Sequence, residues 1–176
     1  TILHEEGLIP TAIIGFVGQI FCATCVNKSG LFVEFNNGMP SGGFETNHNV
    51  EESLLIRLLH ITQNSSTLDQ FDKKISPSSP ADYSLVVNVV NVTHTGAFEF
   101  SAGQGIMRKT NFTHNEIIAS ANSFSHPDWT LKPTDEQCWF GHSRRDNLVE
   151  QVQNFPVLSP KNLTSVMDID LKEGGG

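Results

Sequence analysis

The clearest alternation of apolar residues along the chain lies at residues 83–100. Side chains of a strand point alternately to opposite faces, and here both faces are apolar. One face carries Tyr83, Leu85, Val87 and Val89, and the other carries Val86, Val90 and Val92. Such a strand is typical of a sheet centre that is covered on both sides. A polar turn at 94–96 then leads to Phe98 and Phe100, so the spacing predicts a β-hairpin.

A helical period occurs at residues 49–61, where apolar side chains recur at every third or fourth position. We expect Asn49 to cap this helix, since an asparagine oxygen accepts a bond from a free backbone amide there. Glu51 and Glu52 would lie in the first turn, where the helix dipole favours negative charge. The predicted buried stripe consists of Leu54, Leu58 and Ile61, with Leu55 and Leu59 beside it.

The other elements are shorter. Residues 30–36 predict a strand, and the serine- and proline-rich residues 76–81 predict an exposed connector. A capping box predicts a short helix at 114–123, and a last helix is expected at 144–155, before a proline. The glycine-rich residues 171–176 predict a flexible tail.

With 176 residues, the chain has the size of one domain, and we expect residues 1–176 to fold as a unit. The patterns predict an α+β fold: one mainly antiparallel sheet with two or three helices packed on one face or end. The formal charge is −8 with only 11 Lys and Arg residues, which disfavours a broad basic face for nucleic acid. The charge favours neutral, cationic or protein partners, and no cofactor is predicted.

Residues 7–26 form an uncharged run, long enough in principle for a membrane anchor. Pro10, Gln19 and the acidic residues that precede the run disfavour that interpretation. We therefore expect a core element. The β-branched and aromatic residues from Ile13 to Val26 predict a buried strand, or a helix followed by a strand.

Two further patterns bear on the compartment. Five N-x-S/T sequons occur where chance predicts roughly two, at Asn27, Asn64, Asn91, Asn111 and Asn162. This excess favours a secreted or surface glycoprotein. The sequence does not indicate an oligomeric state.

The three cysteines are compatible with free, disulfide-bonded or metal-bound thiols. Cys22 and Cys25 form a C-x-x-C pair, and Cys138 lies far along the chain. Together with His142 they would complete a tetrahedral zinc site, but Cys22 lies in an apolar run rather than in a knuckle turn. We favour buried thiols that pack as small apolar side chains, and we predict no metal site.

The stretch NNGMPSGGFET, residues 36–46, has an unusually permissive backbone. Glycine allows positive φ, proline fixes φ, and serine bonds nearby amides, so a plain strand-to-helix turn explains the composition. The alternative is a functional loop whose backbone amides meet a ligand. On that hypothesis Ser41, Gly42 and Thr46 are candidate binding residues.

Gly38-Met39-Pro40-Ser41-Gly42, with Thr46 and a predicted helix after it, resembles the motif B loop of picornavirus-type RNA-dependent RNA polymerases. The resemblance covers residues 27–59 and implies a mobile turn followed by a helix near the incoming ribose. The chain departs from that family in lacking a Gly-Asp-Asp sequence or any adjacent aspartate pair. Nucleotidyl transfer needs such carboxylates to hold two metal ions. Val50 also stands where the family has an asparagine that senses the ribose.

A second candidate region is the loop at 126–145, which contains both tryptophans of the chain. Tryptophan and arginine are the residue types that most often anchor interfaces. The candidate binding residues here are Trp129, Trp139, His142, Arg144 and Arg145. The alternative is that both tryptophans only fill the interior beneath a loop.

These observations favour a non-enzymatic recognition or assembly module, such as a viral or cell-surface glycoprotein domain that binds a protein or glycan. No set of catalytic residues is predicted. The alternative hypothesis, which depends on the 36–46 loop, is a fragment or degenerate relative of a viral RNA-dependent RNA polymerase palm.

Overall fold

The computed structural model describes residues 1–39, 45–76, 80–110, 117–130, 132–157 and 159–169. Its centre is a seven-stranded antiparallel sheet in which every strand pairs with its neighbours in the sequence. The strands are β1 (Ile2–Leu3), β2 (Thr11–Ile14), β3 (Thr24–Asn27), β4 (Phe32–Asn37), β5 (Leu85–Val90), β6 (Thr95–Ser101) and β7 (Ile106–Lys109). The α+β class and the antiparallel sheet are therefore confirmed.

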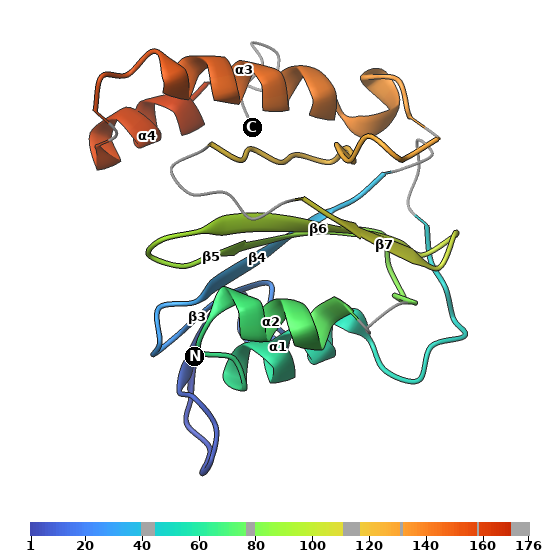
Figure 1. Cartoon of the computed structure of the whole chain (residues 1–176), viewed down its shortest axis with the longest axis vertical. Helices are drawn as coiled ribbons and strands as arrows, with labels where there is room; N and C mark the ends of the chain where they lie inside the picture. The colour runs from blue at the N-terminus through green and yellow to red at the C-terminus, as the bar shows by residue number, and fades with distance from the viewer. Residues whose placement is uncertain (40–44, 77–79, 111–116, 131, 158, 170–176) are drawn as a thin grey trace.

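Helices lie on both sides of this sheet (Figure 1). α1 (Leu54–Gln63) and α2 (Leu68–Ile75) connect β4 to β5 and cover one face. On the opposite side lie α3 (Gly141–Gln153) and α4 (Pro160–Met167), preceded by a 3-10 turn, η2 (Glu136–Cys138). This second helical layer was not expected from the sequence. Among the described residues, no helix is both long enough and apolar enough to cross a membrane.

Strand β5 has the central place that its two apolar faces predict. Leu85, Val87 and Val89 belong to the main core together with α1 and α2. Val86, on the other face, packs with Ala97, Phe124 and Trp129 in a second cluster. The sheet therefore separates two apolar layers, and a charged residue in either layer would be desolvated.

The first helix begins later than the sequence pattern predicts. The N-cap of α1 is Ser53, whose hydroxyl accepts a hydrogen bond from the Leu55 amide, so Asn49 does not cap it. The predicted stripe is confirmed, because Leu54 and Leu58 have no exposed surface. α2, which the sequence analysis did not predict, begins at the Thr67 cap and buries Leu68, Phe71 and Ile75.

Two other predicted boundaries change. Residues 117–123 form no helix, and the capping box before them lies outside the described residues, as do residues 77–79 of the connector and the tail at 171–176. At the ends of the connector, Ser76 and Pro80 are exposed but Ala81 is buried. The last predicted helix exists as α3 but begins three residues earlier, at Gly141.

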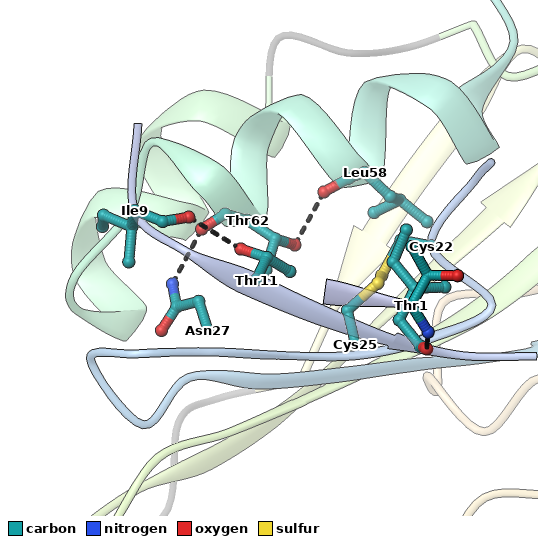
Figure 2. Close-up of a disulfide and its surroundings, with 9 residues drawn as sticks. Thr1, Ile9, Thr11, Cys22, Cys25, Asn27, Leu58 and Thr62 are labelled. Atoms are coloured by element: carbon teal, nitrogen blue, oxygen red, sulfur yellow. Dashed lines mark hydrogen bonds between the residues drawn. A yellow bond between two sulfur atoms is a disulfide. The ribbon is translucent and has the colours of Figure 1, made fainter. Parts of the chain in front are cut away.

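The N-terminal run is a β-hairpin, which corrects the prediction of one buried strand or a helix followed by a strand. β2 and β3 pair in register, with Ile13 opposite Cys25. Cys22 and Cys25 are joined by a disulfide next to α1 (Figure 2). The expectation of three free thiols was therefore wrong for this pair, while Cys138 is free and buried.

Asn27 ties this hairpin to the end of α1. Its side-chain amide donates to the carbonyl oxygens of Thr62 and Ser65, both at 2.7 Å, and its oxygen accepts from the Ser29 and Leu31 amides. Asn27 is 3% exposed. A sugar on this sequon would break one of these bonds inside a packed interior, so the folded chain has no room for a glycan at Asn27.

Candidate functional site

The second apolar layer is anchored to the sheet by a buried carboxylate. Glu99 on β6 is 1% exposed. Its oxygens accept from the Ser125 amide and hydroxyl (2.5 and 2.8 Å), the His126 amide (3.0 Å) and the Trp129 indole (2.6 Å). Arg108, opposite Glu99 in β7, stacks over the Trp129 ring at 4.9 Å from its centroid. These bonds hold residues 125–129 against the sheet, and from there the chain continues to α3.

The start of α3 is held by Asp135. This carboxylate accepts hydrogen bonds from the backbone amides of His142 and Ser143, at 3.1 and 3.2 Å, and from the Ser143 hydroxyl. It thereby satisfies amides that have no partner within the helix. The hydroxyl bond from Ser143 is the largest cause of a pKa for Asp135 below its usual value.

We expect Asp135→Ala to lower the free energy of unfolding by about 1 kcal/mol at pH 7, the usual effect of losing a cap. Because the folded-state pKa is lowered, the carboxylate stabilises the fold above about pH 4 and this contribution is lost as the pH falls further. Urea unfolding at pH 7 and pH 3 should show the difference from wild type shrinking at pH 3. Asp146→Asn, on the exposed side of α3, is the control and should change little. An unchanged difference at both pH values would contradict this role.

Two consecutive aromatic residues before α3 have a left-handed backbone. Trp139 and Phe140 have φ values of +54° and +57°, and each side chain is 46% exposed. Non-glycine residues in this region carry strain, which is common at functional sites. The turn is held because the Phe140 amide donates to the Asp135 carbonyl, and the Arg144 Nε donates to the Trp139 carbonyl at 2.9 Å.

Arg144 is the charged centre of this region. It is 9% exposed, and its Nη2 donates to the Asn122 Oδ1 at 2.6 Å. Burial lowers the pKa of Arg144, but its usual value is so high that the guanidinium stays charged. Within the described part of the chain, no carboxylate lies at ion-pair distance from it. Three of its five N–H donors therefore have no bonding partner among these residues.

Arg144 lines a groove of about 680 Å³ between the sheet and the C-terminal helices. The floor is formed by side chains of β4, β5 and β6, and one wall by residues 117–122. The groove walls are mostly aliphatic, with contributions from Ile117, Ile118, Leu148, Val152, Leu163, Val166 and Met167. The polar residues along it are Glu34, Asn36, Asn88, Thr95, Ser120, Asn122 and Arg144. An apolar groove with a few fixed polar groups is typical of a ligand-binding site.

Asn122 positions the arginine against the sheet. Its side-chain NH₂ donates to the Asn37 backbone carbonyl at 2.9 Å, and its backbone carbonyl accepts from the Met39 amide at 3.0 Å. Its Oδ1 is thereby aimed at Arg144. Asn122 and the groove were not expected from the sequence, since the lining comes from segments far apart in the chain.

The sequence-predicted site residues that the structure describes lie in different parts of the fold. Ser41 and Gly42 lie outside the described residues, and Thr46 is exposed and forms a single bridge with Tyr83. Trp129 belongs to the second apolar cluster and is 3% exposed, so it fills the interior and is not available to a partner. This outcome corrects its assignment as a binding residue.

The remaining candidates cluster at the start of α3. Arg144 bonds Trp139, and the His142 ring lies 3.2 Å from the Pro133 carbonyl. Arg145 pairs with Asp146 at 2.8 Å. Of these residues only Arg144 lines the groove, while Trp139 lies outside its lining.

The described residues contain no cluster of three His, Cys, Asp or Glu side chains placed to hold a metal ion. The sulfur atoms of Cys22 and Cys25 are bonded to each other, so they are not thiolate ligands in this form. The polymerase resemblance stays a prediction, since residues 40–44 at its centre lie outside the described part of the chain. The helix that it implies begins at Leu54.

The fold and the groove define an α+β protein with a helical layer on each side of an antiparallel sheet and a recess beneath the second layer. The chain matches none of the known protein-family models, and a search of characterised proteins likewise returns no match.

Proposed function

We propose that the protein is a non-enzymatic recognition module whose groove binds an apolar segment of a partner protein that carries an acidic group. The observation that carries this proposal is the buried Arg144, which lines the groove without a carboxylate partner among the described residues. A buried guanidinium is strongly stabilised by a bidentate carboxylate. The partner's acidic group would supply that contact.

The lining favours a peptide over a glycan. Its walls are mostly aliphatic, and sugar hydroxyls placed against them would lose their hydrogen bonds to water. Peptide side chains such as leucine would instead bury apolar area there. The disulfide between Cys22 and Cys25 supports a secreted or cell-surface setting, since such bonds persist in oxidising compartments.

The proposal can be tested with an apolar anion, 1-anilinonaphthalene-8-sulfonate, whose size suits the groove. We expect Arg144→Gln to weaken its binding by about tenfold, because the sulfonate loses a charge-assisted bond. Fluorescence titration measures the affinity, and thermal unfolding checks that the variant is folded. Arg145→Gln is the matched control, since Arg145 does not line the groove. Equal effects of the two substitutions would overturn the assignment.

The natural ligand class can be sought by selecting a random peptide library on the folded protein. Wild type should enrich peptides that combine aliphatic residues with Asp or Glu, and these peptides should displace the fluorescent anion. Arg144→Gln should lose the preference for acidic residues while retaining the apolar one. Enrichment that is independent of Arg144 would refute the proposed binding mode.

Trp139 is proposed as a second contact for the partner, beside the groove. Trp139→Ala should weaken binding of a selected peptide by about tenfold, as is common for an exposed aromatic anchor. Its side chain is 46% exposed, so the free energy of unfolding should fall by less than about 1 kcal/mol. Peptide titration and urea unfolding measure the two effects. Equal losses in both would show that Trp139 only supports the fold.

A further inference from the structure

The turn between β2 and β3 exposes a cluster of large apolar side chains, none of which lines the groove. Phe16 is 89% exposed and Val17 is fully exposed, at 107% of the reference area. Ile14 and Ile20, at either side of the turn, are also mostly exposed. We call these four residues the apolar tip. Clustered exposed apolar side chains of this size mark interaction surfaces in folded proteins.

The backbone of the turn is built to present these side chains. The Phe16 amide donates to the Gln19 Oε1 at 2.8 Å, and the Gln19 amide donates to the Phe16 carbonyl at 3.1 Å. A Cβ on Gly15 would lie 2.1 Å from the same Oε1, so a side chain there would displace the Gln19 amide from this position. Gly18 has φ +86°, which also favours glycine. The glutamine at the tip thus faces the backbone, and the apolar side chains point outward.

The base of the hairpin is joined to its surroundings by backbone pairing and by a disulfide. The pairing of Ile13 with Cys25 joins the two strands, and the Cys22–Cys25 disulfide ties the segment that leads into β3 to that strand. The backbone nitrogen of Thr1 donates to the Ile13 carbonyl at 3.0 Å. The tip is therefore held away from the core that begins at Ile13 and Cys22.

The chemistry of the tip favours lipid over protein. Residues 7–27 contain no charged side chain, so the tip itself offers none of the charged groups that give a protein interface its specificity. Its side chains also protrude rather than line a recess. An uncharged apolar projection suits the interfacial region of a bilayer, and the internal bonds of the Phe16 and Gln19 amides lower the cost of leaving water there.

We propose that the apolar tip inserts Phe16 and Val17 into the interfacial region of a lipid bilayer and attaches the protein to its surface. The chain carries a net charge of −8, so the surface must be zwitterionic, since anionic headgroups repel an acidic protein. This contact is independent of Arg144 and of the groove.

Flotation with phosphatidylcholine vesicles tests the proposal on the full chain. Wild type should float with the vesicles, and the double variant Phe16→Ser, Val17→Ser should partition at least about tenfold less, since two large apolar side chains no longer leave water. Val92→Ser is the matched control, because Val92 is 94% exposed in the β5–β6 turn. Adding phosphatidylserine to the vesicles should lower binding of wild type.

A second measurement reports insertion directly. Phe16→Trp should show a blue-shifted emission with phosphatidylcholine vesicles and quenching by brominated lipid, while Val92→Trp should show neither. The proposal is overturned if wild type does not float, or if Val92→Ser loses as much binding as the double variant. It is also overturned if the tip substitutions abolish self-association in sedimentation without vesicles, which would assign the tip to a contact between copies of the chain.

Discussion

Replacing Leu58 by aspartate should leave the chain unfolded at neutral pH. Leu58 has no exposed surface, because it lies on the face of α1 that packs into the main core. The substitution removes a buried leucine and places a carboxylate where no partner is available, and either change alone costs several kcal/mol. The sum, more than about 5 kcal/mol, is comparable to the whole stability of a domain. Circular dichroism and urea unfolding measure the outcome.

Two further variants separate burial from charge. Leu58→Met keeps the volume and should lower the free energy of unfolding by less than about 1.5 kcal/mol. Lys73→Asp introduces the same carboxylate at an exposed position of α2 and should leave the chain folded. A folded, soluble Leu58→Asp protein with a native spectrum would mean that the buried stripe of α1 is misassigned.

Replacing Glu99 by alanine should lower the free energy of unfolding by about 3–5 kcal/mol. The four donors around this carboxylate include the Trp129 indole, which is buried, and two backbone amides. Each would be left without an acceptor, and an unsatisfied buried donor costs about 1–3 kcal/mol. Urea unfolding gives the loss. Fluorescence in a Trp139→Phe background reports Trp129 alone and should shift to the red.

Matched variants distinguish the charge of Glu99 from its shape. Glu99→Gln keeps the side-chain volume and one acceptor oxygen but places an NH₂ group against donors, so we expect an intermediate loss of stability. Glu150→Ala, on the exposed side of α3, should have little effect. A change below about 1 kcal/mol for Glu99→Ala would show that the segment carrying Trp129 is held mainly by apolar packing.

The sequence predicts those parts of the fold whose signal is local and periodic. Strand β5 is apolar on both faces and lies between two apolar clusters, as alternation alone indicates. The stripe of α1 is equally clear. The start of α1 cannot be read from the sequence, because Asn49 and Ser53 are both good caps. A tertiary contact decides between them, since the sheet brings Asp82 close and its carboxylate accepts from the Leu54 amide at 2.8 Å.

Other elements were missed because their signals are short. α2 has a cap at Thr67 and apolar residues at helical spacing, but its eight residues lie among polar ones. α4 follows the same pattern, with a Ser159 cap and Pro160 in its first turn. The sequence favoured a helix at 114–123, whereas the described part of that segment, residues 117–123, is irregular. Bonds of Glu99 and Asn122 hold this segment and the one after it.

The candidate site is the least predictable part. Arg144 was singled out by residue type, yet its burial depends on Asn122, whose position depends on the end of β4. Nothing local in the sequence connects these three segments. Trp129 illustrates the opposite error, because a tryptophan in a loop has the same composition signal whether it faces solvent or the buried Glu99.

The sequential order of the strands has a kinetic consequence. Neighbouring strands are joined by short connections, except that β4 and β5 are separated by residues 38–84, which contain α1 and α2. Closing this long connection loses the most chain entropy before any pairing is gained. The encounter of β4 with β5, guided by the two intervening helices, is therefore the step that should set the rate at which the domain folds.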